Sequence, residues 1–394
     1  MKIKKNDLMI ALAVISYLKP ANVLLWPRIN YIYALLKIVA TAWILLEFLK
    51  QKKGISRIAV ECLLFLTIWA ISIFRNNGTL GEYTQQIASI IGLLILFEVI
   101  STKERLKYLI SVVSTLGKIY FVLELVTIFT NKPLFAEITE GYDRYFLGSD
   151  NYSAFIMIPL CGFIIVNSLI KHGRITASTW SFAIAGFFAL AIPFSVTAMI
   201  SYGLLLAVVF LIVHHFTLKM VDYKKIIAIT VVFLILVVRF NVQNRLMWLL
   251  GKIGKVGLNS RDIIWPRTVS AIMRKPLFGY GALSEAQKNS YLLYGAGHAH
   301  NFVLEFFLET GVIGTFVAIN WLFHSLKGIE KENSLAMKIW KLTLACYCIC
   351  GMFDFYLGLI YFWLFIFTIS KYEHIYNKGK SIESTEFFQR EVKV

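Results

Sequence analysis

The chain has 394 residues, of which 58% are hydrophobic and only 16% are charged, and its mean hydropathy is +0.68. Soluble domains carry about 25% charged residues, so most of this chain cannot be a water-soluble globule. The net charge of +17 does not indicate a nucleic-acid-binding protein, because the basic residues separate apolar runs and form no soluble basic face. The composition predicts an all-α, polytopic integral membrane helix bundle in a lipid bilayer, with no nucleic acid among its partners.

Twelve apolar segments are candidates for membrane spans, since a helix needs about 20 apolar residues to cross the bilayer core. They lie at about 8–26, 29–49, 58–74, 83–100, 108–130, 151–170, 178–194, 197–216, 225–240, 300–323, 337–353 and 355–370. The start of the chain, Met1–Lys5, also suits a signal peptide. However, Lys19 and Pro20 follow the first run without a small-residue cleavage site, so an uncleaved first span is expected. We expect a single polytopic membrane domain over residues 1–394.

The distribution of basic residues predicts the orientation, because short cytoplasmic loops are rich in Lys and Arg. With a cytoplasmic N-terminus, 24 of the 40 basic residues fall on the inner side and 13 on the outer side. We therefore expect a multi-pass protein of the cell (plasma or inner) membrane with both termini cytoplasmic, including a tail over 371–394. The one long connection, 241–299, is then extracytoplasmic.

This loop is unusually basic for an outer segment. Counted from Arg239, it holds nine basic residues, and its acidic residues are only Asp262 and Glu285. A solvated loop is the plain alternative, because long loops tolerate charge on either side. A loop this basic, on the side away from the inner-leaflet positive charge, more readily indicates a bound anion.

An amphipathic helix is predicted within the loop, over Arg261–Met273. Its apolar face recurs at a spacing of three to four and comprises Ile264, Trp265, Thr268, Ile272 and Met273. Ser260 is a suitable N-cap, which places Arg261 in the first turn, where an anion is favoured. Arg267 and Arg274 extend the basic face, and Lys275–Pro276 ends the helix.

His298 and His300 stand where the loop meets the next span. Two histidines at this spacing could chelate a metal from an extended segment, but the acidic residues of the loop are remote in sequence and no third ligand is evident. The cysteines at 346, 348 and 350 do not form a metal site of their own, because residues two apart on a helix point in different directions and the three cannot converge on one ion. We therefore expect no metal and no cofactor.

The late outer loop and the span that follows it resemble a known family, the polytopic O-antigen ligase and O-antigen or capsular polysaccharide polymerase superfamily. The resemblance rests on an ordered set of residues in the late outer loop and the following span: Ser260-Arg261, Trp265, Pro276, Gly279, Gly281, His300-Asn301, Glu309, Gly311 and Gly314. A softer match lies at Asp143–Asn151 and contains Arg144. One element is missing, because the position where many members carry a second Ser-Arg reads Ser195-Val196-Thr197 here.

The resemblance implies a GT-C-like glycosyltransferase with a catalytic loop over 241–299 and no metal requirement. Its donor would be a polyprenyl-diphosphate-linked oligosaccharide, whose anomeric carbon is attacked by an acceptor hydroxyl. Such chemistry needs cations for the diphosphate and a base for the hydroxyl proton. We expect Arg261 to bind the diphosphate and His300 to act as the base, with His298 in reserve. Arg144 is the preferred second cation, and Arg267, Arg239 and Arg245 are the alternatives.

Other motif residues have structural readings beside the functional ones. Trp265 could stack on a sugar or sit in the aromatic belt, and the belt is favoured. Glu309 could pair with a basic residue or orient the acceptor sugar. Pro276, Gly279 and Gly281 are expected to form turns, and Gly311 and Gly314 to allow close helix packing. The resulting list of catalytic candidates is His300, His298 and Arg261.

A polymerase and a ligase share the donor and differ in the acceptor, so the loop motif does not separate them. Frequent Lys, Ile and Asn suggest a low-GC genome and favour the polymerase. A third alternative, a transporter or flippase of lipid-linked glycan, would place charges such as Lys118 and Glu124 along a central cavity. Expected partners are the lipid-linked oligosaccharide, a chain-length regulator and other polysaccharide-assembly proteins. The sugar, the linkage and the oligomeric state are not indicated.

Overall fold

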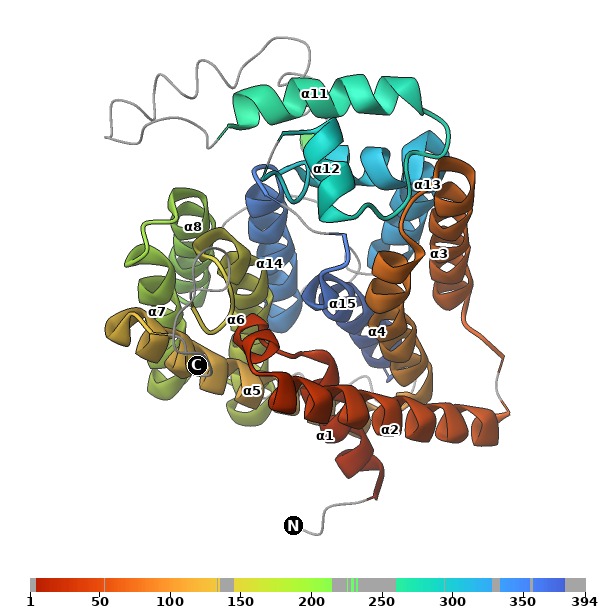
Figure 1. The fold of residues 1–394 in the computed structure, drawn as a ribbon. Helices are drawn as coiled ribbons and strands as arrows, with labels where there is room; N and C mark the ends of the chain where they lie inside the picture. Colours follow the sequence, from red (N-terminus) through yellow and green to blue (C-terminus); the bar gives the residue numbers. More distant parts are fainter. Residues whose placement is uncertain are drawn as a thin grey trace.

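The computed structural model describes residues 5–52, 54–132, 134, 145–214, 225, 228–229, 232, 260–293, 295–327, 334–354 and 357–379. Over these ranges the regular structure is helical, without a strand (Figure 1). In chain order the elements are α1 (Lys5–Tyr17), the 3-10 helix η1 (Ala21–Leu25), α2 (Pro27–Gln51), α3 (Arg57–Asn76), α4 (Leu80–Val99), α5 (Lys103–Thr130), α6 (Asp150–His172), α7 (Ala177–Ala191), α8 (Val196–Val213), α11 (Arg261–Arg274), α12 (Glu285–Tyr291), α13 (Phe302–Leu326), α14 (Leu335–Gly351) and α15 (Ile360–Gly379).

Most of the predicted spans correspond to these helices. Eleven of the twelve are represented, and the other one, 225–240, lies almost wholly outside the described residues. Seven helices of the described part are long and apolar enough to cross a membrane, namely α2, α3, α4, α5, α6, α8 and α13. Helices α1, α7 and α15 are also apolar, but their apolar stretches are shorter than those of these seven helices. The protein is thus a polytopic membrane helix bundle, as the composition predicted.

Two predicted spans differ from the structure at their ends. The first, 8–26, is not one helix, because α1 ends at Tyr17 and η1 begins only after Pro20. Proline lacks an amide N–H and disfavours a helical conformation in the residue before it, so the prediction of a continuous span was wrong. The last helix begins at Ile360 and continues to Gly379, into the segment predicted as a tail. Residues 380–394 of that tail lie outside the described residues.

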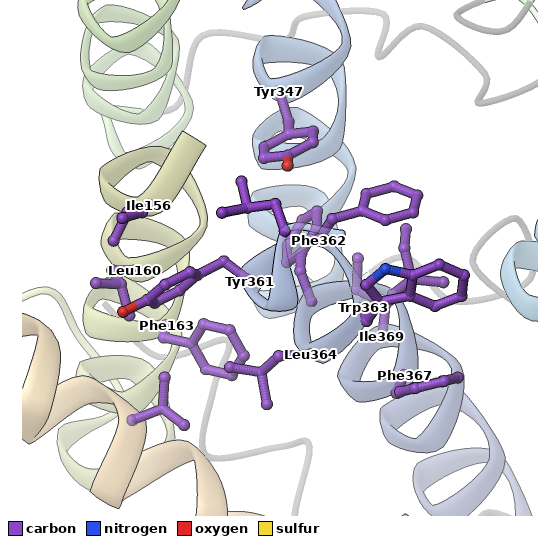
Figure 2. Packing of buried hydrophobic residues seen from close by; sticks show 14 of the residues in the cluster. Ile156, Leu160, Phe163, Tyr347, Tyr361, Phe362, Trp363, Leu364, Phe367 and Ile369 are labelled. Atoms are coloured by element: carbon purple, nitrogen blue, oxygen red, sulfur yellow. The ribbon is translucent and has the colours of Figure 1, made fainter. Parts of the chain in front are cut away.

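Aromatic side chains fill the centre of the bundle. Figure 2 shows Tyr361 of α15 reaching toward α6, Phe362 near Tyr347 of α14, and Trp363 on the side of α15 that faces away from α6. Tyr347 of α14 stacks on Phe362 with ring centroids 6.0 Å apart, and Trp321 of α13 stacks on Trp363 at 5.0 Å. Because lipid tails are as apolar as these side chains, it is close packing that holds such helices together. These contacts explain how helix α15 is held in the centre.

A second, smaller hydrophobic cluster lies at one end of the bundle. Helix α11 crosses this end above α12 and the start of α13 (Figure 1). Ile264, Trp265 and Ala271 of α11 pack there with Leu304 and Leu308 of α13. The prediction of an amphipathic helix is therefore confirmed, and the apolar face of this helix packs on other parts of the protein.

The buried face of α11 differs in part from the predicted one. Met273, expected on the apolar face, is 71% exposed, whereas Trp265 is 1% exposed. Trp265 is buried inside the protein, so the favoured reading of this residue as part of an interfacial aromatic belt was wrong. The reason is that the helix packs against α12 and α13, whose positions the local pattern does not contain.

Helix α13 is broken at Gly311, which has φ +63° and ψ −168°. The segment 276–281 lies along the break and bonds to both sides of it. Tyr280 N and Gly281 N donate to the carbonyls of Leu308 and Glu309, each at 2.8 Å, and Val312 N donates to Pro276 O at 2.8 Å. These bonds satisfy backbone groups that the break removes from the helix ladder.

The glycines of the segment 276–281 make this close approach possible. Gly279 and Gly281 have φ of +66° and +79°, values that suit glycine, but the turn itself lies at residues 276–278, just before them. A Cβ on Gly279 would lie 2.6 Å from Leu308 O, and one on Gly311 would lie 2.4 Å from Leu277 O. The spaced glycines of the sequence motif therefore meet one another in space.

The turn between α3 and α4 anchors the same segment from the other side. Asn76 donates to Gly279 O at 2.5 Å, and Thr79 N donates to Ala282 O at 2.7 Å. Gln287 of α12 donates to Asn77 O at 2.9 Å. Loop 275–287 is thus fixed between the α3–α4 turn and α13, which positions the chain that follows it.

Candidate active site

Helix α11 presents its first residue, Arg261, toward the centre of this end of the bundle. Ser260 occupies the N-cap position, but it has φ +62° and makes no side-chain capping bond, contrary to the expected cap. Its carbonyl accepts from Ile263 N and Ile264 N at 3.0 and 2.9 Å. Arg261 is 7% exposed, and its Nε donates to the carbonyl of Phe353 at 2.6 Å.

His298, His300 and Asp354 form a compact cluster beside Arg261. Nδ1 of His300 lies 3.2 Å from Oδ1 of Asp354, and Nε2 of His298 hydrogen-bonds to the same oxygen. The two imidazole centroids are 3.9 Å apart. An Arg261 Nη lies 3.7 Å from the other carboxylate oxygen of Asp354. One carboxylate therefore contacts two imidazoles and a guanidinium, and the side chain of His300 is more exposed than that of His298, 18% against 2%.

The charges of the cluster set its protonation. Burial raises the pKa of Asp354, but charge interactions and hydrogen bonds with His298 and His300 outweigh it and hold that pKa well below its usual range. The pKa of His300 is lowered from 6.5, chiefly by burial and then by His298, while Asp354 acts in the opposite sense. The arrangement therefore combines an ionised carboxylate with a neutral His300 at pH 7.

The backbone of the histidine segment is held in an unusual conformation. His300 has φ +51°, a left-handed value that costs a residue other than glycine about 1 kcal/mol or more. Its carbonyl accepts from Trp265 Nε1 at 3.3 Å. Asn301, the next residue, caps α13 through bonds from Val303 N and Leu304 N and donates to Met352 O at 2.9 Å. His300 is therefore not the cap of the span, and its imidazole points to Asp354.

Some predicted residues lie elsewhere. Arg267 is on α11, but it is exposed and donates to Leu292 O at 3.2 Å, and no contact with the cluster is among those described. Arg144, Arg239 and Arg245 lie outside the described residues. The segment after Arg144 is described from Tyr145, and Glu124 accepts from Leu147 N at 2.7 Å there. Glu124 thus binds a loop, while Lys118 lies over the ring of Phe182 at 5.0 Å.

Glu309 pairs with a basic residue, which was one of its two predicted roles. Its partner is Lys288 of α12, with Nζ 3.5 Å from Glu309 Oε1. The sequence did not single out Lys288, because its carboxylate partners lie in the next helix. Gly314 packs closely, as predicted, with a Cβ position 3.3 Å from Ile68 of α3.

Asp354 was missed by the sequence reading, which left it between two predicted spans. The available signal was an acidic residue in a very short connection on the same predicted side as the basic loop. The sequence showed no third metal ligand near the histidine pair, but in the structure Asp354 stands in that position. Ligand atoms of His298, His300 and Asp354 all lie within 4.8 Å of one another, close enough to share a metal ion. However, the guanidinium of Arg261 already lies beside that carboxylate.

An apolar groove begins next to the histidine segment. It lies between α13 and α14 and is partly open to the surroundings. These consecutive helices have different packing partners, since α13 packs on α3 and α15, and α14 on α6 and α8. Phe302 and Val303, which directly follow His300 and Asn301, line one end of the groove, and Leu326 and Ile366 line the groove as well.

One comparison with known proteins matches this part of the chain. Residues 180–319 match the family model described as O-antigen ligase. The matched stretch runs from α7 into α13 and includes Arg261, His298 and His300, whereas Asp354 lies beyond it. No curated protein matches the chain.

Proposed function

Because the chain belongs to the O-antigen ligase and polysaccharide polymerase superfamily, we propose that it polymerises polyprenyl-diphosphate-linked oligosaccharides into a surface polysaccharide. The observation that supports this proposal is the cluster of Arg261, His300 and Asp354. It combines a cation, a neutral imidazole and an ionised carboxylate at one end of a membrane bundle.

Glycosyl transfer from such a donor forms one bond and breaks another. The acceptor hydroxyl oxygen bonds to the anomeric carbon while the bond from that carbon to the diphosphate oxygen breaks. The hydroxyl proton passes to the enzyme, and polyprenyl diphosphate leaves with the electron pair. The site must therefore supply a base on one side of the sugar and positive charge near the leaving group.

His300 is the proposed base. An ionised carboxylate can only accept, so the hydrogen bond to Asp354 requires that Nδ1 of His300 carry a proton. Nε2 then has the lone pair that can accept the hydroxyl proton. Asp354 would stabilise the imidazolium as it forms, in the manner of the carboxylate in other histidine-based sites. His298 is almost fully buried and is the reserve candidate.

Arg261 is the proposed diphosphate-binding residue. Guanidinium matches phosphate oxygens with two parallel hydrogen bonds, and burial strengthens such contacts. Its position at the start of α11 adds the positive end of the helix dipole. Arg144 is proposed as the second cation and Arg267 as the alternative.

The groove between α13 and α14 is the proposed path of the polyprenyl chain. Its apolar lining suits a hydrocarbon, and its end at Phe302 follows the proposed base along the chain. The diphosphate would then lie at the membrane surface and the tail in the bundle. This arrangement agrees with the proposed topology of one membrane domain over 1–394, in which loop 241–299 is extracytoplasmic and both termini are cytoplasmic.

The alternative is a ligase, which would use the same cluster to move the glycan to a different kind of acceptor molecule. Frequent Lys, Ile and Asn favour the polymerase. The transporter reading is less well supported, because Glu124 is engaged by a loop and the charged cluster lies at one end of the bundle. We propose metal-independent transfer and, as partners, a chain-length regulator and other assembly proteins.

The test is to replace His300 and Arg261 separately by Ala in the native host and to analyse lipid-linked glycans. A polymerase predicts accumulation of single repeat units, whereas a ligase predicts accumulation of long lipid-linked chains. Membrane levels of each variant, measured by immunoblot, control for expression. Normal surface polymer in both variants would exclude this site from the reaction.

A further inference from the structure

We infer that Glu305, with Lys288 as its counter-ion, is a positioning residue that holds the His298–His300 segment in its reactive geometry. This inference rests on the proposed function of His300. Oε2 of Glu305 accepts a hydrogen bond of 2.7 Å from the backbone N–H of Ala299, the residue between the two histidines. Glu305 is 1% exposed, and its contact with the segment that carries the two imidazoles is this backbone bond. It acts on them through the backbone.

The backbone that Glu305 holds is strained. His300 has a left-handed φ of +51°, and such a conformation persists only where the surroundings fix it. Three hydrogen bonds hold residues 299, 300 and 301 in place. Glu305 holds the amide of Ala299, Trp265 holds the carbonyl of His300, and Asn301 is tied to Met352 O. Glu305 makes the bond of this set that involves a charged group, so it is expected to contribute most.

A buried carboxylate needs a compensating charge. Nζ of Lys288 lies 3.6 Å from Glu305 Oε1 and 3.5 Å from Glu309 Oε1, and the side chain of Lys288 is 12% exposed. Burial lowers the pKa of Lys288, but the two carboxylates outweigh it and raise that pKa above its ordinary value. Lys288 is therefore a permanent cation at neutral pH, and removing it would leave buried negative charge uncompensated.

The ammonium is itself held in place by the loop. Helix α12 begins with a capping box, in which Ser284 accepts from Gln287 N and the Gln287 side chain bonds to Ser284 N. The side chain of Gln287 also contacts Thr79 and Asn77 of the α3–α4 turn. The chain of contacts therefore runs from the α3–α4 turn through α12 and Lys288 to Glu305 and the histidine segment. In this proposal α12 contributes to the reaction by holding the ammonium that compensates the buried Glu305.

Glu309 provides a matched control within the same helix. It lies one turn after Glu305, contacts the same ammonium and is equally buried, but the bond to Ala299 N belongs to Glu305. Glu305→Leu and Glu309→Leu each remove one buried carboxyl group from the pair that contacts Lys288. Only the first removes the acceptor of the Ala299 amide. Glu305→Gln keeps a carbonyl oxygen that can accept that bond.

The experiment uses the full chain, purified and placed in proteoliposomes, with two readouts. The first is kcat and KM for lipid-linked oligosaccharide extracted from the native membranes. The second does not depend on activity and is the rate at which diethyl pyrocarbonate modifies His300, measured by peptide mass spectrometry. Thermal melting of each variant shows whether it folds.

For Glu305→Leu we expect kcat to fall about 10- to 100-fold, the size typical of a small misplacement of a reacting group, with KM for the donor changed less than about 3-fold. Modification of His300 should become several-fold faster, because the segment is released. Glu305→Gln should recover most of both values, and Glu309→Leu should stay within about 3-fold of the native protein.

Equal effects of Glu305→Leu and Glu309→Leu would overturn the inference, because the pair would then be a stabilising ion network only. Native kcat and native His300 reactivity in Glu305→Leu would also overturn it. If the native protein has no activity on lipid-linked oligosaccharide, the proposed function fails. The labelling contrast between the two variants still decides whether Glu305 positions His300.

Discussion

His300 and Asp354 are 54 positions apart in sequence, yet Nδ1 of the histidine lies 3.2 Å from Oδ1 of the aspartate. The two residues belong to different connections, one before α13 and one after α14. Their contact fixes which imidazole nitrogen carries the proton, because the low pKa of Asp354 keeps its carboxylate ionised. A histidine with a defined tautomer and a supporting carboxylate is suited to accept a proton at its other nitrogen.

Replacement of Asp354 by Asn should lower the transfer rate about 10²- to 10⁴-fold, the usual contribution of general-base catalysis. The amide would no longer require the proton at Nδ1 and would not stabilise the imidazolium. The measurement is the amount of lipid-linked repeat units and of polymer in membranes of the native host. Asp262→Asn, in the first turn of α11, removes the same charge near Arg261 in sequence and should have little effect. Equal activity of the two variants would show that Asp354 has no role.

The reaction should lose rate on acidification only below pH 6.5. His300 must be neutral to accept a proton, and its pKa is lowered from 6.5 by burial, so the acid limb of kcat/KM lies below that value. In Asp354→Asn the groups that lower this pKa remain while the carboxylate that raises it is gone. The acid limb should therefore move to still lower pH, measured as the pH dependence of the residual rate. A limb that moves upward would contradict the assigned charges.

The same shifts predict how stability depends on pH. For His300 the unfolded chain binds more protons between about pH 6.5 and its lower folded pKa, so unfolding becomes easier as pH falls through that window. Asp354, with its lowered pKa, contributes stability above about pH 3.9 and loses it below. Melting temperature in detergent at stepwise pH checks both statements, with His300→Gln lacking the first window.

Arg261→Lys should reduce activity about 10- to 100-fold although it keeps the positive charge. Lysine cannot make the bond from Nε to Phe353 O or the paired bonds to a diphosphate. The loss should appear in both KM for the donor and kcat, because the leaving group is bound before and during transfer. Arg274→Lys, at the exposed far end of α11, is the matched control and should stay within about 2-fold. If Arg261→Lys keeps the native activity, Arg261 contributes only its positive charge.

Gly311→Ala should destabilise the protein by about 2 kcal/mol or more, since a Cβ there would lie 2.4 Å from Leu277 O and the left-handed φ of +63° adds strain. The segment 276–281 would be displaced, and activity should fall with it. Gly81→Ala is the control, because nothing lies within 4 Å of its Cβ position in α4. Thermal melting in detergent should separate the two variants, and similar melting temperatures would mean that the break in α13 adapts easily.

Chelators should leave the transfer rate unchanged. Although His298, His300 and Asp354 could together bind a metal ion, the adjacent Arg261 guanidinium already supplies a cation beside Asp354. Excess EDTA is therefore expected to have no effect, and added Zn²⁺ is expected to inhibit by occupying the base. The rate is measured in proteoliposomes after dialysis. Inactivation by EDTA that a divalent metal reverses would assign the cluster to metal-assisted chemistry.

The sequence by itself determined the class of fold. Runs of apolar residues predict membrane helices because lipid offers no hydrogen-bond partners, so the backbone must satisfy itself within each segment. The spacing of apolar residues predicted α11, and the ordered motif indicated Arg261 and His300 as candidate site residues. These features depend on residues close together in the chain, where spacing and composition carry the information.

Only the tertiary structure decided which residues join that motif. Asp354 comes after two further helices, and Lys288 of α12 meets Glu305 and Glu309 of α13 only in the folded chain, so no local pattern contains these pairs. Trp265 was misplaced for the same reason, since its burial depends on what α11 covers. The break at Gly311 is likewise explained by segment 276–281, which supplies the backbone partners that the interrupted helix loses. Contacts between distant segments depend on how the helices pack, and packing is a property of the whole bundle.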